Sequence, residues 1–396
     1  MSHGHFRAYV DHYFAPHPSR EVKELFISRT IMDFAVGAAT LFEPLFLYKI
    51  GFTIPDILIF FGVMYIFYAL LLPIGGRLCH RHGNEHTMLF SSPFLVIYYL
   101  ALLATAYNRY YAVVAILALA TQKILYWPGY HANFAAWSSR VEDGREVSNA
   151  AVLSGLANVL APAFGGAIIM IFGYPTMLLT VALLILLSNL PLLSTPELLA
   201  PRPFSYWGAW RRLFAKENRQ LLFSFFGFGE ELIAMVAWPL YIATILTQAV
   251  TMGAVISLAK LADVLAVLYV GRVSDEEGEN KPAVVRSGAL YTALSWLVRP
   301  VMVGGLGIFL IDSFYRIARE AVGVPLVAIA YEEAQDHVVM EKVVVMQMAL
   351  ALGKVVAAFA GAAVMFLWPG TWAALFMMGA AFTVFYSLIS RPAPAR

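Results

Sequence analysis

Twelve apolar runs of about twenty residues each dominate this sequence. They lie at about 29–48, 56–74, 88–106, 111–130, 148–172, 175–193, 219–246, 249–269, 283–303, 306–329, 343–366 and 371–389. A helix that crosses a bilayer needs ~20 mostly apolar residues, and 60% of the 396 residues are apolar while only 13% are charged. Because the runs are continuous rather than alternating, they predict helices and not barrel strands. We therefore predict an all-α membrane protein with twelve transmembrane helices, which excludes a soluble globular fold.

The runs fall into two groups of six on either side of a polar segment. We expect a cytoplasmic N-terminal segment at 1–28, a six-helix bundle at 29–193, a linker at 194–217, a second six-helix bundle at 218–390 and a cytoplasmic tail at 391–396. The linker contains several prolines and ends near Trp207, Trp210 and Arg211. This composition is typical of a short amphipathic helix on a membrane surface.

The basic residues predict how the chain is oriented. Of the 27 Lys and Arg residues, 18 lie in the segments on the side of the N-terminus, and six lie inside the runs. The other side carries Lys49, Arg109 and Arg299. Because cytoplasmic loops are enriched in Lys and Arg, we expect a multi-pass protein of the plasma (inner) membrane with both termini and the linker in the cytoplasm.

A short motif occurs twice, after the second run and after the eighth. The first copy occupies 76–83 and the second 271–278, an offset of 195 residues. The two copies share glycines, Gly76 and Gly83 in the first and Gly271 and Gly278 in the second, and the candidate gating residues also include Arg81 and Asp275. Two six-helix halves that repeat and are joined by a long loop are typical of a transporter whose halves rock against each other.

This motif and this layout resemble the major facilitator superfamily. The signature of that family between helices 2 and 3 is Gly-x-Leu-x-Asp-Arg-x-Gly, and the first copy matches it at Gly76, Leu78, Arg81 and Gly83, with His80 in place of the Asp. The resemblance covers nearly the whole chain. It implies two pseudo-symmetric six-helix bundles, a gating role for the loop that carries the motif, and transport by alternating access.

A second motif lies in the fifth run, where Ala161-Pro162-Ala163-Phe164-Gly165-Gly166 follows Gly155. It is similar to the Gly-Pro-x-x-Gly-Gly element of the family's drug/proton antiporters, and this similarity slightly favours export. Small residues let two helices approach closely, and a proline kinks a helix. Helix packing alone would explain the same residues.

Charged residues inside the runs are the strongest pointers to function. A charge at mid-bilayer costs at least ~2.5 kcal/mol, so such a residue is expected to face a partner or a cavity. Thirteen of the 52 charged residues lie inside the runs: Arg29, Asp33, Glu43, Lys123, Glu230, Glu231, Lys260, Asp263, Asp312, Arg316, Arg319, Glu320 and Lys354.

The positions of these charges follow the repeat. Asp33 in the first run and Glu230 in the seventh are 197 residues apart, and Lys123 in the fourth run and Arg319 in the tenth are 196 apart. The resemblance implies that helices 1, 4, 7 and 10 line the central cavity. We therefore expect these charges to lie where substrate binds.

Acidic side chains in the runs are candidates for proton coupling, because burial favours the neutral form of a carboxyl group. The candidates are Asp33 and Glu230 first, then Glu43, and further Glu231 and Glu320. The alternative is that they form structural ion pairs, for example Asp33 with Lys123. In the tenth run Asp312 and Arg316 have the spacing of an i,i+4 ion pair, and a self-neutralised network there is equally compatible with the sequence.

Basic and aromatic side chains are the predicted substrate ligands. Arginine presents a planar donor fork to carboxylate or phosphate, and aromatic rings can stack on a planar solute. The predicted set is Lys123, Tyr126, Trp127, Arg316 and Arg319.

These observations predict a monomeric secondary active transporter that moves a small solute by alternating access. No Gly-x-x-x-x-Gly-Lys-Ser/Thr motif is present, so the sequence does not support an ATP-driven pump, and proton coupling is expected. Two alternatives stay open: a lipid or amphiphile flippase of the same fold, and uptake of an organic anion. We expect membrane lipids as partners, and no enzymatic activity, cofactor, metal or nucleic-acid binding.

Overall fold

The computed structural model describes residues 20–138, 144–190, 204–276, 280–332 and 339–389. Within these ranges the chain is helical, with short turns and no strand. The first half contains α2 (Arg20–Thr40), α3 (Glu43–Lys49), α4 (Ile54–His82), α5 (Asn84–Ala104), α6 (Tyr111–Ser138) and α7 (Gly144–Ser188). The second half contains α9 (Arg219–Phe226), α10 (Gly229–Ile245), α11 (Ala249–Glu276), α12 (Lys281–Val298), α13 (Gly304–Glu332), α14 (Val339–Leu367) and α15 (Trp372–Tyr386).

These helices form twelve spans, which confirms the predicted fold class. The first span consists of α2 and α3, the seventh of α9 and α10, and α7 contains the fifth and sixth spans. Within α7 the backbone leaves helical geometry at Gly173, with φ 85°, a conformation that favours glycine because it lacks a Cβ atom. Eight helical segments of the described residues are long and apolar enough to cross a membrane by length and composition alone.

Two spans that we predicted as continuous helices are broken. The first span turns between Thr40 and Glu43, where Pro44 lies at the start of the new helix. The seventh span turns between Phe226 and Gly229. Each new helix has acids in its first turn, Glu43 in α3 and the pair 230–231 in α10. The positive end of a helix dipole favours a carboxylate at that place.

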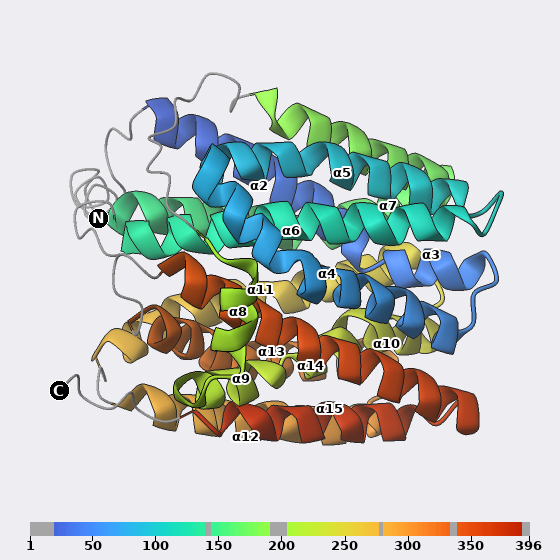
Figure 1. The fold of residues 1–396 in the computed structure, drawn as a ribbon. Helices are drawn as coiled ribbons and strands as arrows, with labels where there is room; N and C mark the ends of the chain where they lie inside the picture. The colour runs from blue at the N-terminus through green and yellow to red at the C-terminus, as the bar shows by residue number, and fades with distance from the viewer. Residues whose placement is uncertain (1–19, 139–143, 191–203, 277–279, 333–338, 390–396) are drawn as a thin grey trace, which may run out of the picture.

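The two halves lie side by side along their length. Figure 1 shows the first half in blue to green above the second half in yellow to red. Across this boundary α4 packs against α14, and α7 packs against α11. The approach of α7 to α11 is close, because a Cβ atom added at Gly253 would lie 2.3 Å from the carbonyl oxygen of Pro162.

A short helix, α8 (Tyr206–Leu213), precedes α9 and is followed by the 3₁₀ turn η2 (Lys216–Asn218). It lies across the direction of the spanning helices (Figure 1) and contacts α4 and α14. Ser205 caps its first turn, because Ser205 Oγ accepts a hydrogen bond of 3.0 Å from the backbone N–H of Gly208. We call the end of the bundle that carries α8 the linker end.

Candidate functional site

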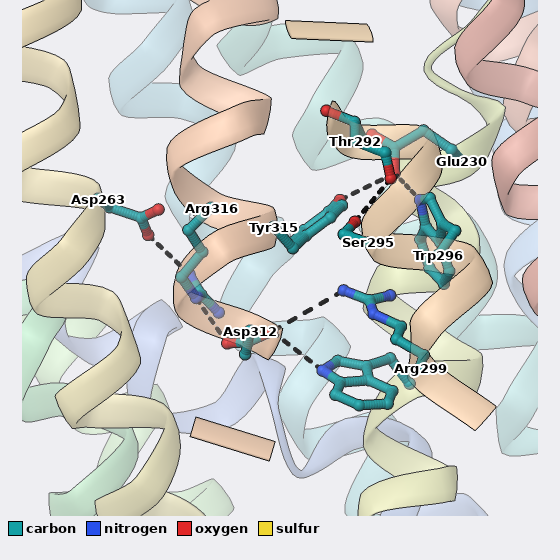
Figure 2. Close-up of polar contacts among 10 residues, drawn as sticks. Glu230, Asp263, Thr292, Ser295, Trp296, Arg299, Asp312, Tyr315 and Arg316 are labelled. Atoms are coloured by element: carbon teal, nitrogen blue, oxygen red, sulfur yellow. Dashed lines mark hydrogen bonds and ion pairs between the residues drawn. The ribbon is translucent and has the colours of Figure 1, made fainter. Parts of the chain in front are cut away.

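The second half contains a network around Asp312 of α13, which is 1% exposed. Arg316, one turn further along α13, bonds Asp312 and Asp263 of α11, at 2.6 Å each. The indole N–H of Trp238 on α10 donates a 3.0 Å hydrogen bond to Asp312. Figure 2 shows this chain of contacts from Asp263 to Asp312. The pair that the i,i+4 spacing of the tenth run predicts is therefore part of a larger network that joins three helices.

A second network surrounds Glu230, which is fully buried. Its carboxylate accepts hydrogen bonds from Trp296 Nε1 at 3.0 Å, Tyr315 Oη at 2.9 Å and Tyr386 Oη at 3.1 Å. Arg319 Nε donates a further bond of 2.9 Å and forms an ion pair with the same carboxylate. Four donors from α12, α13 and α15 thus compensate one buried charge, as burial of a charge requires.

Arg299 lies between these two networks (Figure 2). We counted it among the basic residues on the side opposite the termini, but its side chain is fully buried. Its guanidinium carbon lies 3.7 Å from the ring centroid of Trp296 and 4.3 Å from those of Trp238 and Tyr315. Among the described residues its nitrogen atoms have no hydrogen-bond partner, and its ion pair with Asp312 measures 3.9 Å. Cation–π attraction to three rings is therefore its main compensation.

A further ion pair of the second half lies next to the first half. Glu231 of α10 pairs with Lys354 of α14 at 2.6 Å. Lys354 also donates a 3.2 Å hydrogen bond to the hydroxyl of Tyr65 on α4, in the first half. Nearby, Tyr68 Oη donates to Gln347 at 2.9 Å across the same boundary.

The acids of the first half have simpler surroundings. Asp33 pairs with Arg29 on its own helix at 2.8 Å, and not with Lys123 as the sequence suggested. Glu43 is buried and accepts hydrogen bonds of 2.9 Å from Tyr98 and from Tyr99 of α5. The turn in the first span separates Asp33 from Glu43, which have different neighbours rather than one shared cavity.

Three ionisable side chains in the spans differ from all of these. Lys123 of α6, Lys260 of α11 and Glu320 of α13 form no hydrogen bond or ion pair with any described residue, and each is partly exposed. We call them the unpaired triad. Lys260 does not pair with Asp263, three residues further along α11, and Asp263 is bonded to Arg316 instead.

Two members of the triad lie near the boundary between the halves, Lys260 beside Gly37 and Lys123 beside Tyr65, which is bonded to Lys354 of the second half. Lys123 Nζ is 5.9 Å from the ring centroid of Trp127 and 6.0 Å from that of Tyr65. Lys260 Nζ reaches from the second half to the first, since it lies 3.7 Å from the position that a Cβ atom would take at Gly37 of α2. The charges within electrostatic reach of Glu320 are those of Asp263, Arg319, Arg316 and Glu231.

The five predicted substrate ligands lie in different environments and do not form one cluster of free side chains. Lys123 and Trp127 are partly exposed near the boundary. Tyr126 is buried and stacks on Tyr130 at 5.9 Å, while the guanidinium of Arg29 lies 4.1 Å from the Tyr130 ring. The two arginines of the predicted set, 316 and 319, are already bonded to carboxylates.

The first copy of the repeated motif is helical rather than a loop. It forms the last turns of α4, which ends at His82, and Gly83 provides the turn with φ 89°. A Cβ atom at Gly76 would lie 2.9 Å from Val344 of α14, so the motif packs against the other half, while Arg81 is exposed. In the second copy, Gly271 and Asp275 belong to α11, but their side chains and the whole of Gly278 lie outside the described residues.

The small-residue motif of α7 lies between two helices. A Cβ atom at Gly165 would lie 2.1 Å from the carbonyl oxygen of Ala38 on α2, and one at Gly166 would lie 2.4 Å from that of Ala249 on α11. Gly155 faces Val264 of α11. Just after Pro162, the backbone N–H of residue 163 donates a 2.9 Å hydrogen bond to Ser257 Oγ. The motif therefore contributes to the contact between the halves.

Sequence reasoning did not identify the aromatic donors of the second half. Trp296, Tyr315 and Tyr386 lie within apolar runs in which aromatic residues are common, and no local pattern distinguishes them. A usable signal was the position of Arg299, which lies near the end of the ninth run and directly precedes Pro300. A charged residue at that place can belong to the span as well as to the loop.

Fold and charges together define a helical membrane transport protein built from two related halves. The chain belongs to the Major Facilitator Superfamily, whose family model matches residues 25–334. Similar solved structures include the partially occluded, inward-open xylose transporter XylE from E. coli, with 12% identity, a TM-score of 0.67, and coverage of 93% of this chain and 97% of that one. A mutant of the nucleoside transporter NupG has 11% identity, a TM-score of 0.70, and coverage of 93% of this chain and 98% of that one.

A comparison with curated protein sequences finds no match. The likeness to the two solved structures therefore describes the fold, and the family assignment describes the class: a multi-pass membrane transporter.

Proposed function

We propose that this transporter moves a small organic anion across the plasma (inner) membrane in exchange for, or together with, protons. The observation that carries the proposal is the unpaired triad: two lysines and one glutamate form no hydrogen bond or ion pair with a described residue, while the other ten charged side chains inside the apolar runs each form at least one. A charge kept in a membrane without a partner points to a ligand or ion pathway.

Lys123 and Lys260 are the proposed ligands of the anionic group. They come from opposite halves, and Lys260 reaches across the boundary toward Gly37. An anion bound by both would therefore bridge the halves, so that its binding energy could act on their relative position. Trp127, beside Lys123, offers a ring face to an apolar or planar part of the solute.

Glu320 is the proposed proton carrier. The other predicted candidates have strong partners: Glu230 has four donors, Glu43 has two tyrosines, and Glu231 and Asp33 have one cation each. Protonation of any of these would break existing bonds. Glu320 has no such bonds, and Arg316 and Arg319 lie within reach of its charge. A change in the charge of Glu320 would thus alter the field at the proposed substrate site.

The two arginines of the predicted set are proposed to bind substrate only when their own ion pairs are broken. Arg316 and Arg319 contact a substrate only if the carboxylates of Asp263 and Glu230 release them.

Export is the proposed direction, supported by the packing of Gly165 and Gly166 between α2 and α11. We further propose a monomer whose linker end faces the cytoplasm.

The test begins with thermal unfolding of the purified full chain in detergent with small carboxylates, phosphates, zwitterions and neutral sugars. Anions should raise the midpoint temperature, and counterflow in proteoliposomes should follow the same ranking. Loss of one charge-assisted hydrogen bond costs about 1.5–3 kcal/mol, so Lys123→Gln and Lys260→Gln should each weaken substrate binding roughly 10- to 100-fold.

The matched control is Lys49→Gln, which removes an exposed lysine that lies over the ring of Tyr174. It should transport like the wild type. Unchanged substrate affinity in both triad variants would refute the anion site. Preference for phospholipids over all solutes in a scrambling assay would instead support the flippase alternative.

A further inference from the structure

The helix α8 of the linker is fixed to both halves of the transporter. Ala209 and Leu213, one turn apart, are buried. Tyr206 Oη donates a 2.9 Å hydrogen bond to the carbonyl oxygen of Leu70 on α4, and Arg212 pairs with Glu341 of α14 at 3.2 Å. In Figure 1, α8 lies across the spanning helices. A helix in this orientation runs parallel to the membrane plane.

The opposite face of α8 is aromatic and exposed. Trp207 is 71% exposed and Phe214 is 65% exposed, although both are large apolar side chains. Leu70 and Ile74 of α4, next to the anchor of Tyr206, are also exposed on the flank of a spanning helix. Exposed apolar residues on such a flank face lipid, so the aromatic residues of α8 lie at the border between lipid and water. Tryptophan is enriched at that border.

The same face carries positive charge. Arg211 is four residues after Trp207 and three before Phe214, so the three side chains share one side of the helix. Arg211, Lys216 and Arg219 are exposed, and Arg211 and Lys216 have no hydrogen bond or ion pair with any described residue. Between 205 and 220 the only acid is Glu217.

We infer that α8 and the turn after it form a docking surface for the headgroups of anionic phospholipids. Trp207 and Phe214 insert at the interface, and Arg211 and Lys216 bind the phosphates. A soluble anion would need the cations but not the two exposed aromatic side chains, whereas a neutral lipid would need the aromatic side chains but not the cations. The combination matches an anionic lipid on the basis of charge and apolarity together.

The experiment uses the full chain in phosphatidylcholine vesicles. Either brominated phosphatidylglycerol or brominated phosphatidylcholine is titrated as a quencher of tryptophan fluorescence. The signal of Trp207 is the difference between the wild type and Trp207→Phe. Half of this signal should be quenched at a mole fraction of brominated phosphatidylglycerol at least about fivefold lower than that of brominated phosphatidylcholine, since each cation near an anionic surface contributes about a factor of five.

Arg211→Gln/Lys216→Gln should remove this preference, so that both brominated lipids quench alike. The control Lys49→Gln/Arg286→Gln loses the same charge from two exposed cations on other helices, α3 and α12, and should keep the preference. Equal quenching by both lipids in the wild type would overturn the inference. The absence of quenching by either lipid would also overturn it and would indicate that α8 binds a soluble partner. Reversal of the quenching by inorganic phosphate would overturn it as well and would indicate that the site binds a free anion.

Discussion

Asp33 and Glu230 are 197 residues apart, close to the offset of the repeat, but their surroundings differ. Asp33 has one partner, Arg29, on its own helix, and the side chains are 19% and 25% exposed. Glu230 is fully buried and accepts bonds from Trp296, Tyr315, Arg319 and Tyr386, which belong to three other helices. The repeat thus preserves the position of an acid without preserving its role: one acid is part of a local pair, and the other joins the helices of the second half.

The two basic residues related by the repeat, Arg319 and Lys123, also differ in their surroundings. Arg319 is bonded to Glu230, while Lys123, its equivalent in the first half, has no hydrogen bond or ion pair within the described ranges. Of these two cations, the one in the second half is therefore neutralised, and the one in the first half is not. We conclude that, of two charges related by the repeat, one can stabilise the fold while the other is available for transport.

The largest effect on stability is expected for Glu230→Gln. The amide would keep the size of the side chain but leave Arg319 buried without an opposite charge, and breaking a buried pair costs about 3–5 kcal/mol. Thermal unfolding in detergent should show a large drop in midpoint temperature. A wild-type midpoint would contradict the role of Glu230 in joining α12, α13 and α15.

The pair Arg319→Gln and Lys123→Gln tests the second comparison. Arg319→Gln leaves Glu230 with its three neutral donors and should lower the free energy of unfolding by about 3 kcal/mol. Lys123→Gln removes an unpaired charge and should not lower it. Urea or thermal unfolding of both proteins measures the difference, and equal losses would show that the two positions have the same role.

A smaller effect is expected for Arg299→Met. The variant loses attraction to three rings, about 2 kcal/mol for a desolvated cation, but it also removes a buried charge, and apolar replacement of buried charges is often neutral. Asp312 would keep Arg316 and Trp238 as partners. The change in unfolding free energy should therefore stay within about 1 kcal/mol. A loss as large as that of Glu230→Gln would show that Arg299 is essential to the network.

The smallest effect is expected for Asp33→Asn. A partly exposed ion pair on one helix contributes about 0.2–1 kcal/mol, and Arg29 would keep its contact with the ring of Tyr130. The same unfolding assay should hardly separate this variant from the wild type. A drop comparable to that of Glu230→Gln would remove the distinction between the two acids.

The sequence predicts the spans well and the partners poorly. Twenty-residue apolar runs and the bias in Lys and Arg depend only on local composition, so the twelve helices could be predicted. The turn before Pro44 was missed, because a proline within an apolar run also fits a kinked helix. The donors to Glu230 were missed because periodicity defines which face of a helix is polar but not which helix packs against it.

The candidate site could be predicted only in part. The repeat located the charged positions, and Lys123 was among them, but the sequence placed Asp33 and Glu230 ahead of Glu320 as proton carriers. That ranking depends on pairing in three dimensions. Glu320 is distinguished by the absence of a described partner, which no sequence pattern reveals.

Proton-gradient-driven accumulation in proteoliposomes tests the central claim, that the unpaired triad carries transport while the paired charges hold the helices together. The comparison is between Glu320→Gln and the control Glu217→Gln, which alters an exposed glutamate of the linker. We predict that Glu320→Gln retains counterflow of the organic anion but no longer accumulates it in response to a pH gradient, while the control does both. Normal pH-driven accumulation by Glu320→Gln would contradict this account.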